Sequence, residues 1–244
     1  MKKFYLISAA LLVSGIVLAY EMNTLIDSPT AGILQKGEAE ISGKLYKNNG
    51  LIIGAKVGLF PRFMFGVNYG AEEVVGNKTP KWHDRVEFNA KLRIIDETSQ
   101  MPAIALGYDS QGHGNYHEGE KRYDIKSKGI FATASKNYFF LGNLGFHFGA
   151  NYSLETEDGD EGINLFSGLD KTIGDMIVVV VEYDAAWNDN VSTTVNGRGY
   201  LNASFDVHFS EDLILKLSFY DLFQNRDDTQ GSDRTLTLLY NMTF

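Results

Sequence analysis

Apolar and polar residues alternate along most of the chain after residue 37. Leu51, Ile53 and Ala55, for example, are separated by Ile52 and Gly54 and followed by Lys56. A period of two puts successive side chains on opposite faces of a β-strand. The pattern predicts about twelve strands, over residues 38–45, 51–59, 63–69, 86–92, 104–108, 130–138, 144–154, 163–170, 176–183, 201–209, 213–220 and 236–244. Only for residues 130–138 are the two faces ambiguous.

The connections between these strands differ in length in a regular way. Short connections lie near residues 60–62, 139–143, 171–175 and 210–212. Longer, polar connections lie at residues 71–84, 109–129, 184–198 and 224–233. Short turns at one end and long loops at the other are typical of outer-membrane β-barrels. This arrangement predicts an up-and-down transmembrane antiparallel barrel with both termini in the periplasm. Alternation by itself also fits a soluble sandwich or a secreted β-barrel binding protein.

Aromatic residues and the chain end favour the membrane barrel. The predicted loop-side belt consists of Tyr46, Tyr69, Tyr108, Tyr152, Tyr183 and Tyr220. The opposite belt consists of Phe60, Phe63, Tyr138, Phe139, Phe209 and Phe244. Two belts of amphipathic rings suit two membrane interfaces. Tyr240, Met242 and the terminal Phe244 look like the C-terminal sorting signal that barrel-assembly machinery recognises.

The N-terminal residues predict export. Lys2 and Lys3 precede an apolar run, and Ala19 ends a small-residue cleavage site, so residues 1–19 are expected to be a signal peptide. A membrane anchor is the alternative, although the run is shorter than a spanning helix needs. Residues 20–37 lack a period and are expected to form a periplasmic or plug-like lead-in segment before a barrel domain over residues 38–244.

Composition narrows the functional classes. The formal net charge is −9, and removing residues 1–19 takes away Lys2 and Lys3 and no acid, which changes it to −11. An acidic chain without a basic stripe argues against nucleic acid as a partner. The chain has no cysteine, which excludes thiolate chemistry and suits an oxidising compartment. No cofactor or metal is expected. The partners implied are outer-membrane lipids, lipopolysaccharide and the assembly machinery.

The polar positions of the strands supply candidates for a charged lumen. The candidate lumen-facing residues are Lys56, Lys91, Arg93, Lys136, Lys216, Glu87 and Glu182. A charged interior is expected of such a barrel. The cations suggest selection of anionic solutes, and the mixture of signs weakens that idea. Twelve strands leave at most a narrow passage between side chains.

Two loops contain reactive or acidic groups. Residues 109–117 hold Asp109, Ser110, His113 and His117, which suggest a hydrolytic triad or a metal site. A Gly-rich loop at the barrel rim is the preferred interpretation, because a triad is defined by geometry and not by proximity in sequence. The acidic residues 155–161 lack the spacing of a calcium loop, and a solvated loop is the preferred interpretation there too.

One part of the chain resembles a known family. Residues 103–107, 109–114, 135–136 and 143–149, with sequences AIALG, DSQGHG, SK and NLGFHFG, resemble the YjbH-like outer-membrane proteins over residues 102–149. The resemblance implies a barrel linked to exopolysaccharide production or export, and polysaccharide as a partner. It supplies no catalytic residues. The chain as a whole also resembles short bacterial outer-membrane barrels.

The sequence therefore predicts a non-enzymatic barrel in the outer membrane of a Gram-negative bacterium. Its expected role is a narrow channel or an envelope component. The alternatives are an outer-membrane lipid hydrolase using residues 109–117 and a secreted soluble β-barrel binding protein.

Overall fold

The computed structural model describes residues 21–190, 195–227 and 231–244. The predicted signal peptide and its cleavage site at Ala19 lie outside these residues. The elements are β1 Glu38–Tyr46, η1 Lys47–Asn49, β2 Gly50–Phe60, β3 Phe63–Glu72, β4 Lys81–Trp82, β5 Glu87–Ile95, β6 Ala103–Asp109, β7 His113–His117, β8 Arg122–Ile125, β9 Gly129–Phe139, β10 Asn143–Tyr152, β11 Ile163–Ile173, β12 Ile177–Asp184, β13 Tyr200–His208, β14 Leu213–Tyr220 and β15 Asp233–Thr243. All pairings between strands are antiparallel.

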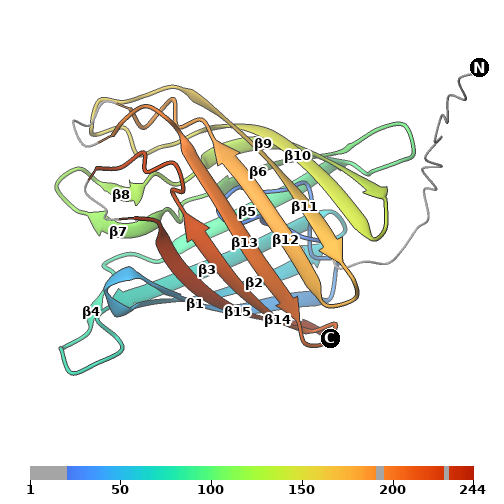
Figure 1. Cartoon of the computed structure of the whole chain (residues 1–244), viewed down its shortest axis with the longest axis horizontal. Helices are drawn as coiled ribbons and strands as arrows, with labels where there is room; N and C mark the ends of the chain where they lie inside the picture. The colour runs from blue at the N-terminus through green and yellow to red at the C-terminus, as the bar shows by residue number, and fades with distance from the viewer. Residues whose placement is uncertain (1–20, 191–194, 228–230) are drawn as a thin grey trace, which may run out of the picture.

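Twelve of these strands form a closed wall (Figure 1). Sequential strands pair around the ring, with β4 at the loop end of β3 and the hairpin β7–β8 inserted between β6 and β9. The ring closes where β1 pairs with β15, in a register that places Ile41 opposite Tyr240 and Ala39 opposite Met242. The predicted all-β, twelve-stranded antiparallel barrel is therefore confirmed.

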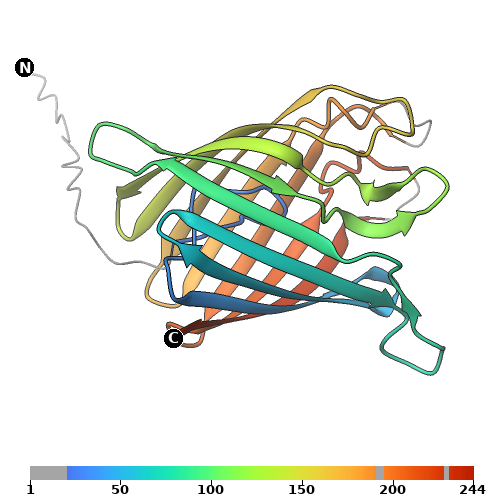
Figure 2. The ribbon, with the colours of Figure 1, turned by 180° about the vertical axis from the view of Figure 1, so that it is seen from behind.

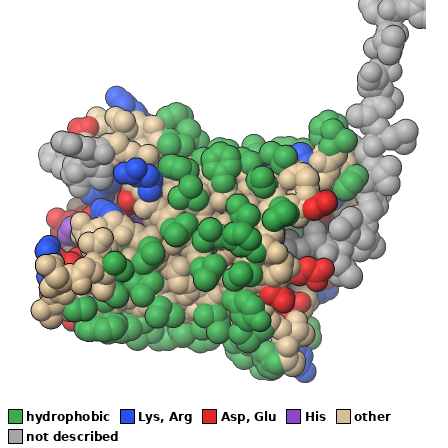
Figure 3. Space-filling model, turned by 60° about the horizontal axis from the view of Figure 1, so that its bottom comes forward, with side chains coloured by type: hydrophobic (Ala, Val, Ile, Leu, Met, Phe, Trp, Pro, Cys, Tyr) green, Lys and Arg blue, Asp and Glu red, His purple; other side chains and the backbone are tan. Residues whose placement is uncertain are grey.

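The wall is apolar outside and polar inside. On β14, Leu217 is 40% exposed whereas its neighbour Lys216 is 8% exposed, and on β5 the same contrast separates Leu92 from Lys91. Figure 3 shows apolar side chains covering the wall, with charged residues gathered towards its two ends. A shallow apolar groove on this outer surface is lined by Phe146, Phe148 and Leu169 among others. This arrangement contradicts the soluble-barrel alternative, which needs the apolar side chains inside.

The aromatic belts differ from the prediction at two positions. Tyr46 and Tyr220 are buried inside the barrel, at 5% and 1% exposure, because each follows an outward-facing residue, Leu45 or Phe219. The period of two therefore turns them inward. Tyr69, Tyr152 and Tyr183 are exposed on the outer surface as expected. At the opposite end Phe60, Tyr138, Phe139, Phe209 and Phe244 are exposed.

The connections give the barrel two different rims. The short-turn rim carries the tight turns and both ends of the wall, where Phe244 N–H donates to the Gly37 carbonyl at 2.8 Å. The long-loop rim carries the β3–β5, β6–β9, β10–β11, β12–β13 and β14–β15 connections. Among the described residues, no helix is long and apolar enough to cross a membrane.

Candidate functional site: an occluded lumen

Residues 21–36 fold back into the barrel from the short-turn rim, and we call them the N-terminal plug (Figure 2). They form a narrow hairpin, in which Leu25 N–H donates to Ser28 O at 2.9 Å and Thr30 N–H donates to Asn23 O at 3.3 Å. The chain therefore enters the lumen, turns near residues 25–28, and returns to the rim where β1 begins. Leu25 and Ala31 are completely buried.

Side chains of the wall bind the carbonyl groups of the plug. Lys91 Nζ donates to Asn23 O at 2.5 Å and to Gly32 O at 2.9 Å. Arg93 Nε donates to Ala31 O at 2.9 Å, and Lys216 Nζ donates to Leu25 O at 2.5 Å. The further donors are Thr133 to Pro29 O and Tyr220 to Ile26 O. Buried carbonyl groups need such partners, since they have left water.

One carboxylate binds the turn of the plug. The backbone N–H groups of Ile26, Asp27 and Ser28 all donate to Glu182, at 3.0–3.1 Å. Asn202 Nδ2 donates to the other side of the same carboxylate at 2.7 Å. Hydrogen bonds to an ionised acceptor are stronger than neutral ones. Glu182 is 1% exposed, so these bonds supply most of the solvation that burial removed.

Two glycines make room for the plug. A Cβ on Gly58 of β2 would lie 1.9 Å from the Gln35 carbonyl oxygen, and a Cβ on Gly168 of β11 would lie 2.5 Å from Leu25 Cδ1. The first approach is to backbone, which cannot rotate away as a side chain can. The wall is therefore shaped to the plug as well as bonded to it.

A second segment narrows the lumen from the long-loop rim. Residues 110–128, which we call the loop insert, include the hairpin β7–β8 and fold inward. The His113 ring stacks on Tyr220 with ring centroids 3.7 Å apart, and its Nε2 lies 3.0 Å from Asp233. Tyr123 donates to Glu87 at 2.8 Å. Residues 109–117, interpreted from the sequence as a loop at the barrel rim, are therefore largely drawn into the barrel, and only the tip, residues 117–121, is exposed.

Ion pairs hold the loop insert to neighbouring loops. Arg122 bridges Asp158 at 2.6 Å and Asp189 at 2.7 Å, and Lys126 joins Asp158 at 2.7 Å. Lys47 pairs with Asp124. Burial raises the pKa of Asp124, but the Lys47 ammonium, His117 and the Asn115 N–H together overcome this effect and lower the pKa to about 2. The acidic residues expected to form a solvated loop thus act as counterions for the insert.

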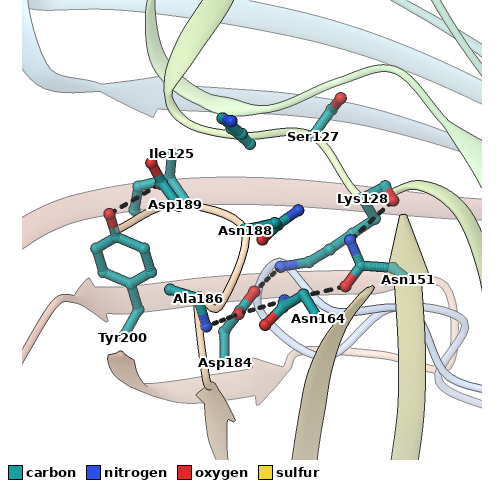
Figure 4. Close-up of a pocket in the computed structure, with 11 residues that line it drawn as sticks. Ile125, Ser127, Lys128, Asn151, Asn164, Asp184, Ala186, Asn188, Asp189 and Tyr200 are labelled. Atoms are coloured by element: carbon teal, nitrogen blue, oxygen red, sulfur yellow. Dashed lines mark hydrogen bonds and ion pairs between the residues drawn. The ribbon is translucent and has the colours of Figure 1, made fainter. Parts of the chain in front are cut away.

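The two segments meet in the middle of the barrel. Leu25 and Ile26 of the plug pack with Ile125 of the insert, and this cluster also contains Val180 and Tyr220. Lys128, the last residue of the insert, pairs with Asp184 and lies 3.5 Å from Asp27 of the plug. Figure 4 shows the small polar cavity beside this junction, which is lined by the Lys128–Asp184 pair among others. It has room for about one water molecule.

The structure places the sequence-predicted lumen residues in different surroundings. Lys91, Arg93, Lys216 and Glu182 contact the plug backbone. Lys56 pairs with Glu40 at 2.9 Å and donates to the Asn23 side chain. Glu87 pairs with Arg85 and accepts from Tyr123.

Lys136 does not lie in the lumen. On β9 the odd-numbered residues Phe131, Thr133 and Ser135 are buried inside, so Lys136 belongs to the outer set with Ile130. Its ammonium lies 3.2 Å from Glu97 and donates to Thr98 O, in the β5–β6 turn. Small residues occupy both faces of this strand, so the alternation of apolar and polar residues does not show in the sequence which face is inside.

The reactive groups of residues 109–117 are bonded to separate partners. Ser110 Oγ accepts from Phe88 N–H at 2.9 Å. Asp109 accepts from Gln111 N–H, and His113 lies between Lys44 and Asp233. His117 pairs with Asp124. The triad drawn from Asp109, Ser110 and His113 therefore has none of its internal hydrogen bonds.

A different serine, histidine and aspartate are brought together in the wall. Ser135 Oγ lies 2.8 Å from His147 Nδ1, and His147 Nε2 lies 2.8 Å from Asp170 Oδ1. Ser135 also accepts the Ala31 N–H at 2.8 Å, so the plug covers it. The three residues lie on the adjacent strands β9, β10 and β11. Sequence reasoning missed this set because the two faces of residues 130–138, which contain Ser135, were ambiguous.

The predicted sorting residues lie on the last strand, β15, and at the chain end, away from the lumen contacts described above. Tyr240 and Phe244 are exposed on the outer surface, and Met242 is partly buried opposite Ala39. Within residues 21–190, 195–227 and 231–244, no group of three His, Asp or Glu side chains is arranged to hold a metal ion.

The site is thus the interior of a barrel of the membrane-spanning type, closed by two segments of its own chain. No family model and no curated protein matches this sequence. Among solved structures, it is similar to the KdgM porin (7% identity, TM-score 0.49, 85% of this chain and 99% of that one) and to the NanC porin (9%, 0.44, 84% and 99%). It is also similar to the translocator domain of the autotransporter NalP from Neisseria meningitidis (13%, 0.40, 85% and 86%). All three TM-scores lie below 0.5, and none of these similarities assigns a function.

Proposed function

We propose that this chain is an outer-membrane channel that its N-terminal plug holds closed and that conducts when the plug leaves the lumen. The observation that carries the proposal is that the plug is bound by reversible contacts alone, chiefly Lys91, Arg93, Lys216 and Glu182 to its backbone. The apolar exterior supports insertion in lipid, and the position of the short turns supports a short-turn rim facing the periplasm. Membrane lipids and the barrel-assembly machinery are then its partners.

A reversible tether tests this proposal. Ala31 of the plug packs against Ala105 of β6. The native chain has no cysteine, so two introduced cysteines would be its only thiols. We expect the Ala31→Cys, Ala105→Cys double variant to show no conductance in planar bilayers when oxidised. Reduction should restore the opening events of the native chain. Each single variant serves as the control for the substitutions themselves.

Removal of the plug provides the complementary measurement. A chain without residues 21–36 should conduct continuously, and so should Gly58→Leu, which leaves no space for the Gln35 carbonyl. Gly43→Ala is the matched control, since a Cβ there meets nothing within 4 Å. Altered migration of unboiled samples in SDS checks that each variant is folded. If folded barrels without the plug conduct no better than the native chain, the proposal is wrong.

A second candidate function rests on Ser135, His147 and Asp170. In a serine hydrolase the hydroxyl attacks an ester carbonyl, the histidine takes its proton, and the aspartate stabilises the imidazolium. Here Ser135 would give its proton to His147 Nδ1, the leaving alcohol would take that proton, and water would release the acyl group. A fluorophosphonate reagent should then label Ser135 in the plug-free barrel. Ser110→Ala is the control, and absence of labelling at Ser135 rejects this function.

The link to polysaccharide production depends on the YjbH resemblance of residues 102–149. In the structure this stretch spans β6, the loop insert, β9 and most of β10. Some of its side chains hold the plug in place, as Ser135 and Lys128 do. Co-purification of a surface polysaccharide with the plug-free barrel would support the link.

A further inference from the structure

Most of the hydrogen bonds between the wall and the plug involve the backbone atoms of the plug. Six plug carbonyls, of residues 23, 25, 26, 29, 31 and 32, accept hydrogen bonds from wall side chains. Four plug N–H groups, of residues 26, 27, 28 and 31, donate to Glu182 or Ser135. The wall side chains come from β5, β9, β12 and β14, so the binding groups surround the segment.

Lys91 and Glu182 of the wall are met by backbone groups of the plug and not by its charges. Elsewhere charges of the two parts do pair: Arg93 with Glu21, and Lys128 with Asp27 at 3.5 Å. Lys91 is 5% exposed, and the groups it donates to are two neutral carbonyls. Glu182 is 1% exposed and accepts from neutral N–H groups. A buried charge is costly unless an opposite charge and hydrogen bonds compensate it. A free peptide carries a terminal carboxylate for Lys91 and a terminal ammonium for Glu182, in addition to the backbone groups.

We propose that the open lumen binds peptides that turn back on themselves as a hairpin, with the plug as the occupant that the chain itself supplies. This inference rests on the proposed opening of the plug. A polyanion supplies no donor to Glu182, whereas three consecutive N–H groups that converge on one carboxylate are a feature of a turning peptide backbone.

The junction with the loop insert adds a preference for an apolar side chain. Leu25 directly precedes the three N–H groups and lies against Gly168, with Ile125 and Val180 in the same cluster. Any side chain at position 168 would fill this space. A bound peptide therefore places a leucine-sized residue immediately before the segment held by Glu182.

Block of the current tests the inference with defined peptides. The probes are a synthetic peptide of residues 21–36, the same peptide N-methylated at Ile26, Asp27 and Ser28, and polyaspartate of similar length. We expect the first peptide to block the plug-free barrel and N-methylation to weaken the block at least tenfold. Replacing Leu25 of the peptide with Asp should also weaken it. Polyaspartate should block no better than the methylated peptide.

Variants of the barrel locate the binding site. Glu182→Gln should bring the two peptides to nearly the same affinity, because it removes the charge that the N–H groups bind. Glu97→Gln, in the β5–β6 turn, should leave the difference unchanged. Equal block by the unmodified and methylated peptides, or stronger block by polyaspartate, would overturn the inference. If the plug-free chain does not fold, Gly58→Leu replaces it.

A direct binding measurement separates this inference from the proposed function. Fluorescence anisotropy of labelled peptide with the detergent-solubilised barrel needs no conductance. Binding without conductance would reject the channel and retain the peptide site. Conductance without binding would retain the channel and reject the peptide site.

Discussion

The two segments that close the lumen are held in opposite ways. The N-terminal plug is bound mostly through its backbone, by wall residues such as Lys91 and Glu182. The loop insert is bound mostly through its own charged side chains, such as Arg122 and Lys126, which reach acidic residues of other loops. The side chains that hold the plug therefore belong mostly to the wall, whereas the charged side chains that hold the insert belong mostly to the insert itself.

This difference predicts how each segment responds to change. A backbone-bound segment tolerates substitution of its exposed side chains, and it leaves as a unit when wall groups are lost. A segment held by buried ion pairs depends on single residues, because removal of one partner leaves the other charge buried. The plug is therefore suited to movement and the insert to a fixed position that narrows its side of the lumen.

Loss of Arg122 is expected to have the largest effect. Arg122→Met leaves Asp158 and Asp189 without their bridging cation, which costs about 3–5 kcal/mol for a buried pair. Hydrogen exchange of residues 110–128 should accelerate strongly, and exchange of residues 21–36 should change little. Lys121→Met is the control, because its pair with Glu157 is exposed to solvent and therefore adds little to stability. Equal effects of the two substitutions would contradict the comparison.

The wall was predictable from the sequence and the insert was not. Alternation on residues 38–45 or 213–220 reflects one lipid-facing and one interior face, so the period alone places Lys216 and Leu217. The sequence around Arg122 does not indicate whether this side chain is solvated in a loop or buried against Asp158. The distinction depends on acids 36 and 67 positions further along the chain, which meet it only after the barrel closes.

Acidification is expected to have an intermediate effect on the insert. The pKa of Asp124 lies at about 2, below its usual value of about 3.9, so its pairs with Lys47 and His117 stabilise the insert above pH 4. This contribution, on the order of 2 kcal/mol, is lost as the pH falls from about 4 through 2. Burial raises the pKa of Glu155 and Asp189, and their protonation opposes part of the loss.

Exchange of residues 110–128 at pH 5 and pH 2.5, corrected for intrinsic rates, measures this effect. Asp124→Asn should reduce the difference between the two conditions. A native-like difference in that variant would show that other carboxylates control the insert.

The plug illustrates a second limit of sequence reasoning. Residues 21–36 lack a period because they pair with no strand of the wall over any length. Their partners are single side chains that the sequence places correctly on an interior face, such as Lys91, without indicating what they bind. Ser135 was missed, and Lys136 was assigned to the wrong face, for the same reason. Small residues occupy both faces of β9, so the sequence does not show which face is inside.

The smallest expected effect concerns Ser135, which joins the plug to the wall. Ser135→Ala removes the acceptor of the Ala31 N–H and the hydroxyl partner of His147. A neutral hydrogen bond contributes about 0.5–1.5 kcal/mol, so the Ala31 amide should exchange roughly 2–10 times faster and opening events should become more frequent by a similar factor. Ser110→Ala is the matched control, because Ser110 bonds Phe88 of the wall and not the plug. Faster exchange of the loop insert instead of the plug would show that the two segments move together, and the contrast between them would then be lost.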